Sequence, residues 1–301
     1  MHASEEPAHA DYLALRNRLL GPLRDRFLTT DQLCEAGRIM CGRPESLSLY
    51  GIPAPEMDAR GIRILGRTAV ECTKDPHPVA IAGVITDIEA TAPAADGEAM
   101  VVDLFCGSGN IGHHLGRCLD RPVYASELDP VVHEAGRRNL DRVGSTVRLR
   151  HADYRDLLGA LPARSERDIY IVEPSWGQAF TPEGLDLTRT SPPVPEIIGH
   201  IQRSRDHVPC LVVVETSDRV VRGSLDTWCG NAVHLRTLVP KPFPPHRTGS
   251  RFHLYRLGES RSRAVRAMED NGPDARQPRA QATEAGDGEH RQEGVDPVRE
   301  D

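Results

Sequence analysis

Four acidic side chains stand at the ends of short apolar runs, where carboxylates can bind a polar ligand together. Asp103 lies near the end of the first run, Glu127 and Asp153 follow the next two, and Glu173 ends the fourth. If the runs are parallel strands, their carboxyl ends meet at one edge of the sheet, where open α/β sheets bind ligands. An ionised carboxylate only accepts hydrogen bonds. The pattern therefore favours a ligand rich in N–H and O–H donors.

A glycine-rich turn follows the first of these acids. Gly107 and Gly109 let the backbone come close to a ligand, because neither carries a Cβ atom. A helix expected to begin near Asn110 offers free N–H groups at the same place. On spacing alone, Gly107, Gly109 and Gly112 also satisfy the G-x-G-x-x-G pattern of dinucleotide sites. At this point a nicotinamide cofactor remains open.

The stretch 101–110 (VVDLFCGSGN) resembles motif I of class I S-adenosylmethionine-dependent methyltransferases. In that family an acid at the Asp103 position supports the amino-acid part of the cofactor, whereas dinucleotide folds usually reach their glycines from an apolar strand. The resemblance therefore favours S-adenosyl-L-methionine (SAM). It implies cofactor contacts by Asp103, Phe105, Cys106, Gly107, Gly109, Asn110, Ile111, Glu127, Leu128, Asp153, Tyr154 and Glu173.

Two of the acids have separate predicted roles within the cofactor site. A carboxylate at the tip of the second strand, Glu127, can accept hydrogen bonds from both ribose hydroxyls. The resemblance gives Asp153 the amino group of the adenine, although Asp153 could instead only cap the helix that follows it. Asp129 before Pro130 is a better candidate for a plain helix cap.

Residues 173–176 (EPSW) resemble motif IV of amino-group methyltransferases, in which a polar side chain and the first proline carbonyl hold the substrate amine. The resemblance makes Glu173, Pro174 and Trp176 the predicted catalytic residues, with the indole ring stacking on a planar substrate. Residues 177–189 resemble the guanine-binding loop of the trimethylguanosine synthase group. Glu173 in place of a shorter side chain, and Ser175 in place of a second proline, are departures from the motif.

The segment 73–77 (TKDPH), just before the core, is a further candidate. The family often folds an upstream segment over the cofactor, so Lys74 and His77 are possible cleft residues. Trp176 has a simpler alternative as a core or lid aromatic.

Apolar runs alternate with helical patterns from residue 100 onward. Strands are expected at 100–104, 122–126, 146–151, 168–173, 210–215, 232–239 and 252–257, and helices near 110–119, 130–143, 154–161, 194–205 and 219–228. This alternation predicts an α/β fold with a doubly wound, seven-stranded, mostly parallel sheet of the Rossmann-like methyltransferase type. The last two runs have no helix between them and predict an antiparallel hairpin.

The flanking segments differ in composition from this core. Residues 1–99 predict a helical N-terminal extension, with leucines at helical spacing, a cap at 29–31 and a helix near 77–90. Residues 100–257 form the expected catalytic domain. Residues 258–301 are dense in charge, Gly and Pro and predict a disordered tail.

Charge and cysteine content exclude several classes of protein. The formal net charge is -7, most of it due to the tail, so no basic stripe favours nucleic acid. Seven scattered cysteines lack zinc-ligand spacing, so no metal is expected and a reducing compartment is favoured. No apolar run is long enough to span a membrane. A cytoplasmic enzyme is predicted, and the N-terminal helices could pair two copies.

The sequence thus predicts a SAM-dependent methyltransferase of small-molecule biosynthesis that acts on nitrogen. One alternative is methylation of guanine N2 in RNA, and another is a SAM-consuming intramolecular displacement without methyl transfer. A non-catalytic scaffold and an NAD enzyme are the remaining alternatives.

Overall fold

The computed structural model describes residues 5–92, 97–226, 232–241 and 249–258. Its centre is a seven-stranded sheet in the order β10-β11-β9-β6-β3-β4-β5. Only β11 runs against its neighbours, and it pairs antiparallel with both β9 and β10. The predicted fold class and the terminal hairpin are confirmed. The strands are β3 Val101–Asp103, β4 Val123–Glu127, β5 Arg148–His151, β6 Ile169–Val172, β9 Cys210–Ser217, β10 Ala232–Leu238 and β11 Ser250–Leu257.

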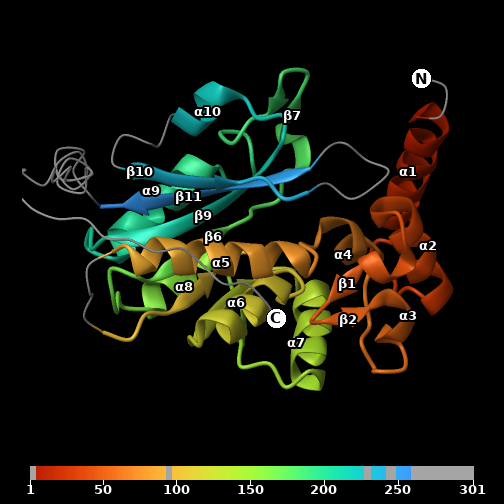
Figure 1. Cartoon of the computed structure of the whole chain (residues 1–301), viewed down its shortest axis with the longest axis horizontal. Helices are drawn as coiled ribbons and strands as arrows, with labels where there is room; N and C mark the ends of the chain where they lie inside the picture. Colours follow the sequence, from red (N-terminus) through yellow and green to blue (C-terminus); the bar gives the residue numbers. More distant parts are fainter. Residues whose placement is uncertain (1–4, 93–96, 227–231, 242–248, 259–301) are drawn as a thin grey trace, which may run out of the picture.

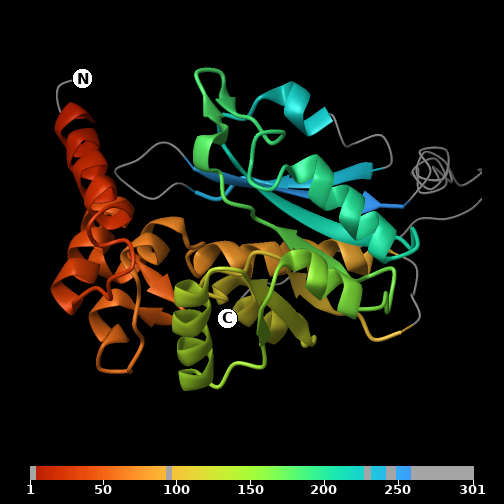
Figure 2. The same ribbon diagram turned by 180° about the vertical axis from the view of Figure 1, so that it is seen from behind.

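Helices cover both faces of this sheet (Figures 1 and 2). All four residues of the central strand β6 are buried. Successive side chains of a strand point to opposite faces of the sheet, so both faces are covered here, which explains the continuous apolar runs in the sequence. The short α10, Arg222–Asp226, is the counterpart of the helix expected at 219–228. On one face lie α5 Pro76–Ala90, α6 Asn110–Leu119 and α7 Pro130–Arg142, and on the other lie α8 Tyr154–Ala160 and α9 Val194–Ser204.

The N-terminal segment is mainly helical, as expected. Thr29 caps α2 through a capping box with Gln32. A small hairpin was not expected: Tyr50 and Gly51 both adopt positive φ at its two-residue turn, a geometry usually signalled by Asn-Gly. The elements are α1 Glu5–Leu20, α2 Thr30–Cys41, η1 Pro44–Ser46, β1 Ser48–Leu49, β2 Ile52–Pro53, α3 Ala54–Met57 and α4 Gly66–Glu71. Their shared core extends to Leu140 of α7.

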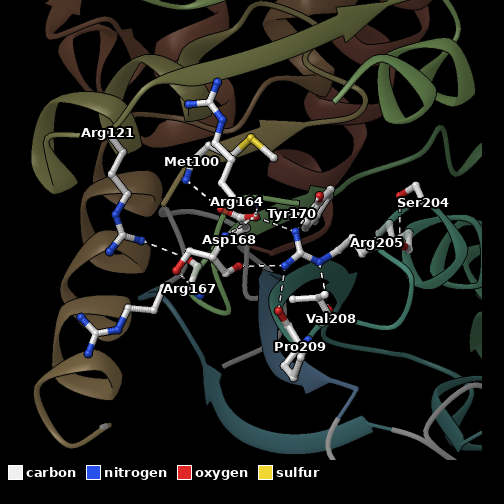
Figure 3. A network of polar contacts seen from close by, with 12 residues as sticks. Met100, Arg121, Arg164, Arg167, Asp168, Tyr170, Ser204, Arg205, Val208 and Pro209 are labelled. Carbon is white, nitrogen blue, oxygen red and sulfur yellow. Dashed lines mark hydrogen bonds and ion pairs between the residues drawn. The ribbon is translucent and has the colours of Figure 1, made fainter. Parts of the chain in front are cut away.

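A buried polar network ties together the starts of the central strands (Figure 3). Asp168, directly before β6, accepts hydrogen bonds from the backbone N of Met100 at 3.0 Å and of Arg164 at 2.9 Å. Its Oδ2 also accepts from Nη1 of Arg205 at 2.6 Å. Both charged side chains are fully buried. The network fixes the amino-terminal edge of the sheet relative to the end of α9.

One sequence prediction concerns a part of the chain beyond this description. The predicted disordered tail lies, apart from Gly258, outside the described residues. Within the described ranges, no helix is both long and apolar enough to cross a membrane.

Candidate cofactor and acceptor site

The predicted carboxylates gather at the carboxyl edge of the sheet, opposite the Asp168 network. From β3 the chain builds outward to β4 and β5 on one side, and β6 and β9 lie on the other. The strand order therefore reverses between β3 and β6. In doubly wound sheets this switch point opens a crevice for ligands.

The glycine turn between β3 and α6 has the backbone shape that its sequence demands. Gly107 has a φ of 52° and Gly109 a φ of 77°, both in the left-handed region. A Cβ atom on Gly107 would meet nothing within 4 Å, whereas one on Gly109 would lie 2.8 Å from a methyl carbon of Leu140. Gly109 is thus needed for packing as well, while Gly107 borders open space in which a ligand can lie against the backbone.

Glu127, at the end of β4, braces this turn. Its Oε2 accepts a hydrogen bond from the N–H of Gly107 at 3.0 Å, and its Oε1 accepts from the N–H of Asp129 at 2.8 Å. Burial raises the pKa of this carboxyl above its ordinary value. A carboxylate has about four acceptor positions, so two remain for donors such as ribose hydroxyls. The predicted ribose site therefore fits the geometry.

Asp103 is the second feature that fits the predicted cofactor. Its side chain is only 2% exposed, and its Oδ2 has no hydrogen-bond partner among the described residues. Burial raises the pKa of Asp103 to about 7, and backbone hydrogen bonds from Phe105 and Gly112 oppose this rise. A buried acceptor without a donor costs free energy. An ammonium group, such as the one that SAM carries, would supply both the donor and the compensating charge.

Asp153 and Tyr154 lie at the end of the third strand, as expected. Asp153 caps α8 by accepting from the backbone N of Arg155 at 2.8 Å, so the predicted cap is confirmed. The Arg155 guanidinium also binds both carboxylate oxygens. The Tyr154 hydroxyl meets Nδ1 of His200 at 2.8 Å, and its ring centroid lies 5.0 Å from that of Phe105. The adenine role of Asp153 stays a prediction.

The other predicted cofactor contacts surround the turn with different exposures. Cys106 and Ile111 are buried, whereas Leu128 is among the most exposed apolar side chains described. Asn110 is almost fully buried, and both polar atoms of its side chain are engaged, one by the backbone N of Tyr50 at 2.7 Å and the other by the carbonyl of Thr73 at 2.8 Å. Asn110 therefore joins the N-terminal segment to the turn.

Glu173 lies at the acceptor end, directly after β6. Its Oε1 is buried without a partner in the described ranges, and its Oε2 accepts from the Thr73 hydroxyl at 3.3 Å. Burial, together with the charges of Glu215 and Asp103, raises the pKa of Glu173 well above its ordinary value. The segment 73–77 thus does reach the site, as predicted. His77, however, packs with its ring 5.7 Å from that of Phe252.

Glu215 is a site residue that the sequence analysis missed. The register pairs Val172 with Val214, so Glu173, directly after β6, lies beside Glu215 of the neighbouring strand β9. Burial raises the pKa of Glu215, while the Ser250 side chain and the Lys74 charge lower it. An acid at the end of an apolar run was the signal for Glu127 and Glu173, and the run at 210–215 carries the same signal.

The other predicted acceptor residues, Pro174 and Trp176, follow Glu173 closely in the chain. Pro174 is buried, and Trp176 packs against the core on the α8 and α9 face but stays partly exposed. The Trp176 ring makes an edge contact with Phe180, with centroids 5.6 Å apart. Phe180 belongs to a second unexpected hairpin, formed by β7 Phe180–Thr181 and β8 Gly184–Leu185, and is 51% exposed. The two rings offer a surface for a planar molecule.

The chain is similar in sequence to a methyltransferase. A release factor glutamine methyltransferase of Corynebacterium glutamicum is 32% identical over 106 residues, which is 35% of this chain and 37% of that protein. The match therefore spans little more than a third of the relative. No protein-family model matches the chain.

Solved structures of methyltransferases are among those that the chain resembles, at low similarity. Magnesium protoporphyrin IX methyltransferase of Synechocystis PCC 6803, with bound SAM, has a TM-score of 0.42 and 12% identity over 60% of this chain and 78% of that one. Precorrin-6y C5,15-methyltransferase of Geobacter metallireducens has a TM-score of 0.42 and 14% identity over 63% and 91%. Likeness this distant carries no argument about the reaction.

The geometry divides the site into two ends with different chemistry. Around Gly107, an open backbone turn and the carboxylates of Asp103 and Glu127 suit a ligand with hydroxyl and ammonium donors. Around Glu173, acidic groups and an exposed aromatic pair suit a nitrogen-bearing, planar partner. Asp103 acts electrostatically on Glu173, so the two ends are contiguous.

Proposed function

We propose that this protein binds SAM and transfers its methyl group to a nitrogen atom of a small molecule. The observation that carries the proposal is the unpartnered Oδ2 of Asp103 beside the open turn at Gly107, with Glu173 on the next strand. The partial similarity to a methyltransferase supports the same chemistry. That relative is named for glutamine, a side chain that contains nitrogen.

Three of the residues described above would hold the cofactor. Glu127 accepts from the ribose hydroxyls, Asp103 receives the ammonium group, and Gly107 lets the backbone approach. When bound, SAM supplies a methyl group on a positively charged sulfur that is itself a good leaving group. No residue of the chain has to activate the leaving group, so the protein contributes chiefly alignment and exclusion of water.

The acceptor end would orient the nitrogen. Glu173 accepts a hydrogen bond from the acceptor N–H, and the Pro174 carbonyl accepts a second one, which directs the nitrogen lone pair at the methyl group. Trp176 and Phe180 stack on the acceptor. Holding two reactants in such a geometry can supply several kcal/mol of barrier reduction, about 7 kcal/mol in well-oriented cases.

Binding of S-adenosylhomocysteine, the demethylated cofactor, tests the proposal by calorimetry. We expect Glu127→Ala to weaken binding at least about tenfold, because two charge-assisted hydrogen bonds are lost. Glu134→Gln, an exposed acid on α7, serves as the control and should bind as the wild type does. Since Glu127 also braces the turn, thermal unfolding of both variants must show a folded protein. Full affinity in a folded Glu127→Ala protein would exclude the ribose site.

The partly exposed Trp176 ring and the exposed Phe180 ring favour a second candidate, a guanine base in RNA. Phosphate contacts normally dominate RNA affinity and make it fall steeply with salt. A salt titration of RNA binding separates the candidates: steep weakening from micromolar affinity supports RNA, and the absence of binding supports the small molecule.

A further inference from the structure

Glu173 and Glu215 form a carboxyl pair that the cofactor does not require. Glu173 directly follows β6 and Glu215 lies within the neighbouring parallel strand β9. The strand register, continued by one residue, pairs the two acids on the face of the sheet that Asp103 occupies. Each acts on the protonation of the other. Two adjacent acids thus lie at the carboxyl edge of the central strands, on the same face as Asp103.

The surroundings of the pair leave acceptor capacity unused. Thr73 donates to Glu173, the Ser250 side chain bonds Glu215, and the charge of the Lys74 ammonium acts on Glu215. The two carboxyl groups also share a hydrogen bond with each other. Apart from that bond, the Oε1 atom of Glu173 and the Oδ2 atom of the 2%-exposed Asp103 have no partner among the described residues. Buried acceptors without donors indicate a missing donor-rich ligand.

Among the described residues, neither a metal site nor the neighbouring basic side chains account for the Glu173–Glu215 pair. In the described part of the chain, no three His, Cys, Asp or Glu side chains are arranged to hold a metal ion. Lys74 donates to the carbonyl of Cys72 at 2.9 Å, so part of its hydrogen-bonding capacity is used by the backbone. His77 on α5 has its pKa lowered by burial to about 4, so it is neutral near pH 7 and supplies no cation. The Lys74 charge lowers the pKa of Glu215, whereas the charges of Glu215 and Asp103 raise the pKa of Glu173.

Adjacent buried carboxyl groups cannot both ionise cheaply, so such a pair holds on to one proton. Burial and like charge raise the pKa of Glu173 well above its ordinary value, and burial raises that of Glu215. A pair with one proton carries a negative charge and can take up a second proton. A cation with N–H donors satisfies both the charge and the free oxygen, whereas a neutral amide or base leaves the charge uncompensated.

We propose that Glu173 and Glu215 together select a protonated amine as the methyl acceptor and take up the proton that this amine must lose. The inference rests on the proposed function and names its class of substrate. The ammonium R–NH₃⁺ gives one proton to the ionised carboxylate, and the electrons of that N–H bond become the nitrogen lone pair. The lone pair forms the N–C bond, and the electrons of the S–C bond pass to sulfur. Glu173 contacts the amine, and Glu215 is a positioning residue that sets the proton affinity of Glu173.

Matched probes test this inference on the full chain saturated with S-adenosylhomocysteine. Phenethylamine is an aromatic cation, and phenylacetamide carries the same ring with a neutral amide. We expect calorimetry to show the wild type binding the amine at least about tenfold more tightly. Glu215→Gln should remove most of that preference while its affinity for S-adenosylhomocysteine and for phenylacetamide stays within about twofold. Glu183 is an exposed acid on the β7–β8 turn, and Glu183→Gln serves as the control. It should leave the affinities for phenethylamine, phenylacetamide and S-adenosylhomocysteine unchanged.

The pH dependence separates a proton-holding pair from a merely structural Glu215. Because burial and like charge raise the pKa of Glu173 well above its ordinary value, wild-type affinity for phenethylamine should keep rising with pH above the range in which an exposed glutamate titrates. In Glu215→Gln the rise should be smaller. A wild type that binds phenylacetamide as tightly as the amine, or binds neither, overturns the inference, as does a folded Glu215→Gln protein with unchanged amine binding. If the wild type does not bind S-adenosylhomocysteine, the proposed function itself fails.

Discussion

A buried aspartate lies at each of the two edges of the central sheet, and the two differ in their hydrogen-bond partners. At the amino edge, Asp168 is fully buried and saturated by backbone N–H groups and by Arg205. At the carboxyl edge, Asp103 is almost equally buried but keeps one oxygen without a donor. The two residues belong to neighbouring strands of one sheet. The fully hydrogen-bonded Asp168 stabilises the fold at the amino edge. The unpartnered oxygen of Asp103 indicates ligand binding at the carboxyl edge.

The largest change in the free energy of unfolding is expected at the amino edge of the sheet, where both carboxylate oxygens of Asp168 have donors. Asp168→Asn leaves the Arg205 guanidinium buried without its counter-charge, which should lower the free energy of unfolding by about 3–5 kcal/mol. Asp141→Asn, the same change in the exposed Arg137–Asp141 pair, should cost about 0–1 kcal/mol. Urea denaturation of both variants measures the difference. Equal losses would show that the Asp168 network contributes no more than a surface pair.

Replacing Asp103 should raise the free energy of unfolding, whereas replacing Asp168 should lower it. Its raised pKa, about 7, means that the unfolded chain ionises first, so wild-type stability falls as pH rises from about 4 to about 7 and then levels off. Asp103→Asn removes this penalty. The variant should be more stable than the wild type above pH 7, by up to about 4 kcal/mol, with the difference vanishing near pH 4.

Urea denaturation at several pH values, together with S-adenosylhomocysteine binding, checks this prediction. The stabilised Asp103→Asn protein should bind the ligand more weakly. A variant that loses stability at every pH, or gains it without losing affinity, would show that Asp103 serves the fold rather than a ligand.

The smallest change in stability is expected at Asp153. Like Asp168, this residue serves the fold, because it caps a helix, and like Asp103 it is a predicted ligand contact, here to the adenine. Asp153→Ser keeps a capping hydroxyl, so stability should change by no more than about 0.5 kcal/mol. If the carboxylate also receives the adenine amino group, S-adenosylhomocysteine affinity should fall several-fold. Thermal unfolding and calorimetry on the same sample separate the two roles. Unchanged affinity would leave Asp153 as a cap alone.

Local sequence signals predicted much of this molecule. The apolar runs placed the seven strands, and the caps at Thr29 and Asp129 are as expected. The β1–β2 hairpin was missed because its Tyr-Gly turn lacks the usual turn residues. The engagement of Asn110 by Tyr50 and Thr73 was missed because those residues lie far away along the chain.

The sequence by itself determined the fold class, the glycine turn after Asp103 and the acids that end the strands, because strand periodicity and turn chemistry are local. Only the tertiary structure decided which acids become neighbours and which keep their protons. Strand order brings Glu215 beside Glu173, and burial raises the pKa values of both acids. The protonation of a carboxyl group depends on the charges and the solvent around it, and in this protein those are set by distant parts of the chain.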